Sequence, residues 1–92
     1  MTEENSSHFK ASYQLDCSWQ LCPVPILMTE EKLSDLGCGE VLEVIFTDPG
    51  ARPDLEAWCD ATGNPLLGFR ECAEAPRLKS SAFVRRGASW KK

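Results

Sequence analysis

A cysteine followed by two closely spaced prolines is the feature of this sequence best suited to covalent chemistry. Cys22 precedes Pro23, and Pro25 follows two residues later. Proline is tolerated in the first turn of a helix because the N–H groups there have no intrahelical acceptor. With Pro23 as the first helical residue, Cys22 is the N-cap, where the helix dipole favours an anionic thiolate or persulfide. The pattern predicts an exposed, nucleophilic Cys22.

The two prolines also limit how strongly an anion is held at this helix start. Neither Pro23 nor Pro25 has an N–H group, so the nearest backbone donors are mainly those of Val24 and Ile26. Partial stabilisation suits a sulfur atom that must be handed on. On these local features alone, a structural cysteine at a helix start is an equally good interpretation.

Two residues just before this segment could support chemistry at Cys22. Asp16 is expected to orient the loop or to accept backbone hydrogen bonds. Cys17 is separated from Cys22 by four residues and could resolve a persulfide by forming a disulfide. We favour the alternative in which Cys17 is a strand-end thiol without a role. Cys59 lies on a predicted apolar helix stripe and is expected in the core.

Metal, cofactor and acid–base sites find little support in the sequence. There is no Cys-x-x-Cys pair, and the single imidazole, His8, lies in the polar N-terminal segment. A cysteine–histidine dyad would depend on His8 alone. The neighbouring carboxylates Glu30 and Glu31 fit a solvated helix face better than an acid–base pair. We predict no metal and no cofactor.

Length, charge and cysteine content restrict the class of protein. Ninety-two residues suffice for one domain with a small core. A net charge of −4 disfavours direct nucleic-acid binding, which depends largely on Lys and Arg. The polar first ten residues predict no signal peptide, and no apolar run predicts a membrane span. Five cysteines without a leader predict free thiols in a reducing compartment, so we expect a cytoplasmic protein.

Hydrophobic patterns, together with helix and turn signals, predict the element order β-α-β-α-β-β. These elements lie in a domain at 11–87, which follows a disordered tail at 1–10 and precedes a C-terminal tail at 88–92. The expected strands are 12–16, 41–47, 66–72 and 81–86, and the expected helices are 23–36 and 53–62. The strand at 41–47 has apolar residues on both faces, which is typical of a central strand.

Turn and helix residues complete this prediction. Gly37 and Gly63 are expected to end the helices, Gly37 as a left-handed cap, and Pro53 is expected at the first helical position of the second helix. The economical packing is an α/β (α+β) two-layer sandwich, in which a four-stranded mixed sheet carries both helices on one face. The first two strands would be parallel and the last two antiparallel.

A wider set of residues resembles the TusA/SirA-like sulfur-carrier family. The matching segments are Leu15-Asp16, Cys22-Pro23-Val24-Pro25, Gly39-Glu40, Asp48-Pro49-Gly50-Ala51, Trp58-Cys59, Gly63 and Phe83-Val84-Arg85-Arg86. The resemblance extends over roughly residues 11–87, and Cys-Pro-x-Pro is its most specific element. It implies a two-layer α/β sandwich whose active cysteine is Cys22.

The resemblance further implies a sulfurtransferase-like carrier. Its Cys22 would accept sulfane sulfur as a persulfide from a cysteine desulfurase or a rhodanese-like donor and pass it to an acceptor protein. Destinations in the family include tRNA thiolation, molybdenum-cofactor metabolism and sulfur oxidation, among which this sequence does not choose. The alternatives are a non-enzymatic interaction or regulatory module and a redox domain using Cys17 and Cys22 as a dithiol.

The sequence departs from the family pattern in three respects. Trp19 stands where the family usually has glycine, three residues before the active cysteine. Glu30 and Glu31 occupy a helix segment that often carries basic residues in the family, which suggests a different partner. Asn64 stands where many relatives have histidine.

Overall fold

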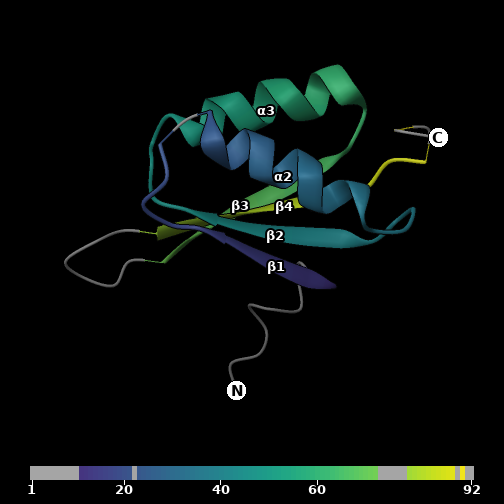
Figure 1. The fold of residues 1–92 in the computed structure, drawn as a ribbon, viewed down its shortest axis with the longest axis horizontal. Helices are drawn as coiled ribbons and strands as arrows, with labels where there is room; N and C mark the ends of the chain where they lie inside the picture. The colour runs from purple at the N-terminus through teal and green to yellow at the C-terminus, as the bar shows by residue number, and fades with distance from the viewer. Residues whose placement is uncertain (1–10, 22, 73–78, 89, 91–92) are drawn as a thin grey trace.

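The computed structural model describes residues 11–21, 23–72, 79–88 and 90, and it has two layers. The elements are β1 (Tyr13–Cys17), α2 (Val24–Ser34), β2 (Val41–Phe46), α3 (Ala51–Thr62), β3 (Leu66–Cys72) and β4 (Lys79–Arg85). The four strands form one sheet in the order β1-β2-β4-β3, with β1 parallel to β2 and the other pairs antiparallel. Both helices cover the same face (Figure 1). The predicted fold class and strand directions are confirmed.

Strand β2 is central, as its sequence indicated. Leu42, Val44 and Phe46 are buried on the face that carries the helices. They pack with Leu33 of α2 and Leu55 of α3 in one hydrophobic core. Burial of these side chains is the main favourable term holding the two layers together.

Helix α2 differs from its predicted range at both ends. It begins at Val24 with Pro23 as N-cap, and it ends at Ser34 with Asp35 as a right-handed C-cap. The prediction of a left-handed Gly37 was wrong. The N–H of Gly37 instead donates to the Glu40 side chain at 2.7 Å. The left-handed conformation falls two residues later, at Gly39, whose φ is 86°.

Helix α3 begins two residues before Pro53, at Ala51. The N–H of Ala51 donates to the Asp48 carbonyl at 3.0 Å, and the Ala51 side chain is fully buried, so the helix start is fixed against the core. Pro53 is tolerated because the N–H groups of a whole first turn have no intrahelical partner. Gly63 ends α3 in the left-handed conformation, with φ of 80°, as predicted.

Asn64 and Trp90 hold the end of the domain at which α3 leads into β3. Asn64 is fully buried and accepts the N–H of Gly87 at 2.7 Å. Trp90 packs edge to face on Trp58 of α3, with ring centroids 5.6 Å apart. Trp90 therefore contacts the domain although it lies in the segment expected as a C-terminal tail. The expected tail at 1–10, with His8, lies outside the described residues.

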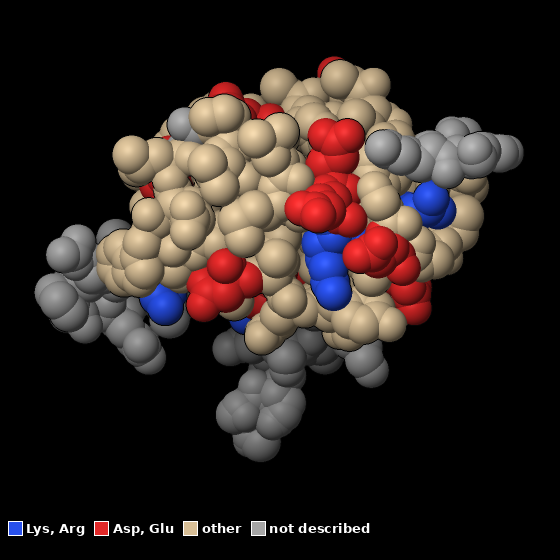
Figure 2. All heavy atoms as spheres, viewed as in Figure 1, with Lys and Arg blue, Asp and Glu red and all other residues tan. Residues whose placement is uncertain are grey.

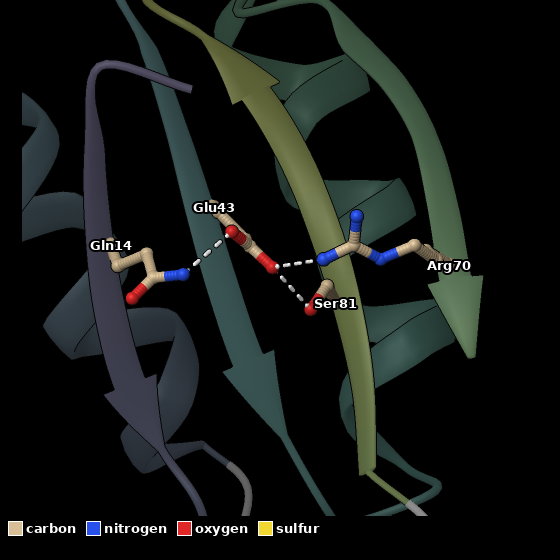
Figure 3. A network of polar contacts seen from close by, with 4 residues as sticks. All are labelled: Gln14, Glu43, Arg70 and Ser81. Atoms are coloured by element: carbon tan, nitrogen blue, oxygen red, sulfur yellow. Dashed lines mark hydrogen bonds and ion pairs between the residues drawn. The ribbon is translucent and has the colours of Figure 1, made fainter. Parts of the chain in front are cut away.

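The sheet face away from the helices carries a polar network centred on Glu43 of β2 (Figure 3). Its carboxylate accepts hydrogen bonds from Gln14 at 3.0 Å, from Ser81 at 2.7 Å and from Arg70 at 2.9 Å. Only 8% of the Glu43 side chain is exposed. A buried carboxylate is costly unless it is paired, so these three donors make the central position of Glu43 possible.

Removing the cation of this network should destabilise the domain. We expect Arg70→Met to lower the free energy of unfolding by about 1–3 kcal/mol, because the buried Glu43 side chain loses its ionic partner. The double variant Glu43→Met/Arg70→Met should regain part of this loss. Urea denaturation measures both. Arg85→Met, at an exposed position of β4, is the control, and an equal loss there would contradict the assignment.

No helix among the described residues is long and apolar enough to cross a membrane.

Candidate functional site

The start of α2 places a proline, rather than a cysteine, at the N-cap. Pro23 holds this position with φ of −98° and ψ of 16°, and Val24 is the first helical residue. Cys22, predicted as the N-cap, lies outside the described residues. Its two neighbours, Leu21 and Pro23, are both exposed. The helix is thus one residue shorter at this end than the proline pattern predicted.

The backbone donors expected to serve a sulfur anion already have acceptors. The N–H of Val24 donates to the Leu21 carbonyl at 2.9 Å. The N–H groups of Ile26 and Leu27 both donate to the Pro23 carbonyl at 3.1 Å. The prediction that the N–H groups of Val24 and Ile26 are the donors available to sulfur was therefore wrong. The reason is a tight turn that closes on Leu21 and Pro23 before the helix begins.

Pro25 fixes the beginning of α2 against the sheet. It is fully buried, and its carbonyl accepts the hydroxyl of Thr29 at 2.7 Å. Thr29 and Leu33, one and two turns further on, are also fully buried. This stripe explains why α2 packs well despite a mixed apolar pattern, since a proline and a threonine form part of its buried face. The stripe holds the preceding loop in a defined place.

The loop after β1 is shaped by contacts with Asp16 and Thr47. The carboxylate of Asp16 accepts the N–H of Ser18 at 2.9 Å. The nearby Ser18 hydroxyl, the hydrogen bond from the Ser18 N–H and the charge of Lys79 lower the pKa of Asp16. Thr47 accepts the N–H of Trp19 at 2.8 Å and so ties this loop to the end of β2. Sequence reasoning missed Thr47, because only the parallel pairing of β1 and β2 brings it to the loop.

Trp19 adopts a backbone conformation that favours glycine. Its φ is 69°, and it is the one residue other than glycine with a positive φ in the described part of the chain. A side chain in this region costs about 1–2 kcal/mol for steric reasons. The departure from the family pattern at position 19 thus falls on a backbone conformation that disfavours a Cβ atom.

Cys17, named as a possible resolving thiol, lies in the core. Its side chain is fully buried, and burial, with the nearby charge of Asp16, raises its pKa to about 11. Cys59 is also buried, as predicted, and burial raises its pKa to about 11. Thiolates are the reactive form of cysteine, so both groups are inert near neutral pH. This placement favours the structural interpretation of Cys17 over the dithiol alternative.

Exposed thiol and metal-ligand positions are sparse elsewhere in the described residues. Cys38 is exposed near the other end of the domain, and its sulfur lies 3.7 Å from the Ala88 carbonyl. No group of three or more His, Cys, Asp or Glu side chains capable of holding a metal occurs in the part that the structure describes.

Comparison with known proteins assigns the family. The sequence profile described as "Sulfurtransferase TusA" matches residues 13–78. The chain belongs to the TusA sulfurtransferase family. It is 44% identical over 78 residues to the putative sulfur carrier protein YrkF of Bacillus subtilis, a match covering 85% of this chain and 40% of YrkF. It is 43% identical over 58 residues to the sulfur carrier protein TusA of Allochromatium vinosum, covering 63% of this chain and 76% of that protein.

The relatives differ in how much of their length this chain spans, and a solved structure shares its fold. This chain spans less than half of YrkF, whereas it spans most of the Allochromatium TusA. The crystal structure of a SirA-like protein from Desulfitobacterium hafniense shares the fold, with a TM-score of 0.61 at 20% identity. That similarity covers 78% of this chain and 95% of the other. The TusA family match includes the whole stretch from β1 through α2, with Cys22 and both prolines.

The cysteines of this TusA-family domain should differ sharply in alkylation. At pH 8 we expect iodoacetamide to modify Cys38 readily and to modify Cys17 and Cys59 at least about 100-fold more slowly, because burial keeps both as neutral thiols. Only above about pH 11 should their thiolates become the major form. Peptide mass mapping gives the rates. Rapid native-state labelling of Cys17 would contradict its burial and restore the dithiol hypothesis.

Glycine should suit position 19 better than alanine. We expect Trp19→Gly to have a free energy of unfolding about 1 kcal/mol above that of Trp19→Ala, because alanine keeps the Cβ atom that the positive φ disfavours. Urea unfolding curves supply the comparison. The matched pair Gln20→Gly and Gln20→Ala should show the ordinary order, with alanine the more stable. The same order at both positions would mean that Trp19 carries no backbone strain.

Proposed function

We propose that this domain is a sulfur carrier that holds sulfane sulfur as a persulfide on Cys22. The observation that carries the proposal is the position of Cys22 in a chain of the TusA sulfurtransferase family. It stands between Leu21, which is 72% exposed, and Pro23, which is also exposed. The proposal is supported by relatives whose names describe sulfur carriers.

The proposed chemistry conserves sulfur and electrons. The thiolate of Cys22 attacks the outer sulfur of a donor persulfide, forming a new S–S bond as the bond to the donor sulfur breaks. The donor leaves as a thiolate, and Cys22 carries the persulfide. An acceptor thiolate then attacks that outer sulfur and releases Cys22 as a thiolate. No external oxidant is consumed, because the sulfane sulfur is only exchanged between thiols.

The structure supports a carrier that relies on its partners for catalysis. Val24 and Ile26 use their N–H groups within the turn and helix start, so little beyond the helix dipole remains to hold a sulfur anion there. Such an anion stays transferable. Precise placement of donor and acceptor thiols must then come from the proteins that dock.

We propose a cysteine desulfurase or a rhodanese-like protein as donor and a sulfur-acceptor protein as recipient. The recipient pathway could be tRNA thiolation, molybdenum-cofactor metabolism or sulfur oxidation. The cytoplasm is the proposed compartment, because a carrier thiol has to stay reduced between transfers. The cysteines whose side chains are described, Cys17, Cys38 and Cys59, are all free.

Persulfide formation on Cys22 is directly measurable by mass spectrometry of the intact protein. After incubation with a cysteine desulfurase and L-cysteine, we expect a gain of one sulfur atom that dithiothreitol removes. Cys22→Ser should abolish the adduct, because no thiolate remains at that position. Cys38→Ser, which removes an exposed cysteine elsewhere, should retain it.

Circular dichroism establishes that both serine variants are folded. An adduct that persists in Cys22→Ser would place the sulfur on another residue. The lack of any adduct with either desulfurase or rhodanese donors would favour the alternative of a non-enzymatic interaction module.

A further inference from the structure

Exposed apolar side chains are concentrated in one short segment of this domain. Among the described residues, six large hydrophobic side chains are exposed, and four of them lie between positions 19 and 27. These four are Trp19 (56% exposed), Leu21 (72%), Val24 (37%) and Leu27 (58%). Single exposed hydrophobic residues need no explanation, but a concentrated group marks an interaction site. We name these four residues the apolar patch.

The apolar patch is formed by the loop before α2 together with the first turn of that helix. Val24 and Leu27 are three residues apart, so they are neighbours on the helix surface. The buried stripe of α2 is a different one, made of Pro25, Thr29 and Leu33. Val24 and Leu27 therefore do not belong to the face of α2 that packs against the core.

Trp19 adds a second, independent indication that the patch is functional. A tryptophan with φ of 69° carries backbone strain, and 56% of its surface remains exposed. The hydrogen bond from its N–H to Thr47 holds this conformation. Strained residues that persist in a fold are concentrated at functional sites. Because more than half of Trp19 is exposed, this strained position presents an apolar ring that a binding partner can contact.

Acidic residues border the apolar patch. Glu30 and Glu31 follow Leu27 by three and four positions on α2, and Asp16 is exposed at the end of β1. Residues 16–35 include four acidic side chains and one basic one, Lys32, which lies over the Tyr13 ring at 5.4 Å. Figure 2 shows acidic side chains, with a basic one among them, over the middle of this face, whereas the surface towards the start of α2 is largely uncharged with acidic atoms at its edge.

We infer that the apolar patch is a docking surface for a protein partner whose own apolar contact area is bordered by Lys or Arg. The inference rests on the proposed function in that the partner would exchange sulfur with Cys22, which lies between Leu21 and Pro23 in the sequence. Complementary charge steers such a partner and fixes its orientation, while burial of the apolar side chains supplies affinity. A second copy of this chain fits poorly, because two acidic borders would face each other.

Peptide probes with an activated cysteine test this chemistry without the natural partner. Each probe carries its cysteine as a pyridyl disulfide, flanked by Leu and Lys, by Leu and Glu, or by Ser and Lys. The Cys22 thiolate attacks the peptide sulfur, forms a mixed disulfide and displaces pyridine-2-thione, whose absorbance gives the rate. The Cys38→Ser protein is used so that the exposed Cys38 does not contribute, and Cys22→Ser establishes the site of reaction.

The Leu/Lys probe should react fastest. We expect it to exceed the Ser/Lys probe by about tenfold, from partial burial of leucine. We expect it to exceed the Leu/Glu probe by about two- to fivefold, as is typical of exposed charge pairs. The double variant Leu21→Ser/Leu27→Ser should remove the first preference, and Glu30→Gln/Glu31→Gln should remove the second. Leu67→Ser, an exposed leucine of β3, is the matched control and should preserve both.

The small reagent 2,2′-dithiodipyridine should react equally with all these variants, which separates docking from thiol reactivity. Equal rates for the three probes would overturn the inference. A dimer in sedimentation that Leu21→Ser/Leu27→Ser abolishes would overturn it too, by assigning the patch to a second copy. The probes need only the Cys22 thiol, so their result is independent of persulfide formation. Equal probe rates with a persulfide still formed by a desulfurase would overturn the docking inference alone, and unequal rates without a persulfide would overturn the proposed function alone.

Discussion

Two buried residues, Cys17 and Pro25, fix the two ends of the segment that contains the candidate site. Cys17 ends β1 inside the core, and Pro25 enters the core one residue after α2 begins. Between them, Trp19, Leu21 and Val24 are exposed. Because β1 pairs in parallel with the central strand β2, the chain has to cross from the sheet to the helix layer here. The buried ends, together with the hydrogen bond from the Trp19 N–H to Thr47, hold the described residues of this short segment at the surface.

This arrangement limits what the helix start can do for an anion. An exposed charge near a helix N-terminus gains about 0.3–1 kcal/mol from the dipole, which is at most about fivefold in the population of a thiolate. Direct N–H donation could add more, but Val24, Ile26 and Leu27 donate to the carbonyls of Leu21 and Pro23. Under the proposed function, such a helix start would activate a sulfur atom on Cys22 only weakly, which is the property that a carrier requires and a catalyst does not.

The fold was predictable from the sequence where one residue type decides the local structure. Apolar residues on both faces of Val41–Phe46 indicated a central strand, and Gly63 indicated the end of α3. The prediction failed where a side-chain contact determined the backbone conformation against the local residue preference. Glu40 holds Gly37 in a turn and shifts the left-handed position to Gly39. At the site, the sequence indicated Cys22 and its prolines, but the carbonyl acceptors of Leu21 and Pro23 depend on a turn that no residue preference specifies.

This domain can shield apolar side chains on its open sheet face, so the exposure of the apolar patch needs another explanation. On the open face of the sheet, three donors accommodate the buried carboxylate of Glu43. On the same face, Arg70 lies over the ring of Phe83 at 5.3 Å, and Phe83 is only 1% exposed. The same chain leaves Leu21 and Leu27 more than half exposed. A small domain has little stability to spare, and leucines left more than half exposed contribute less to it than buried ones. The docking role proposed above would account for their presence in the segment between the end of β1 and the first turn of α2.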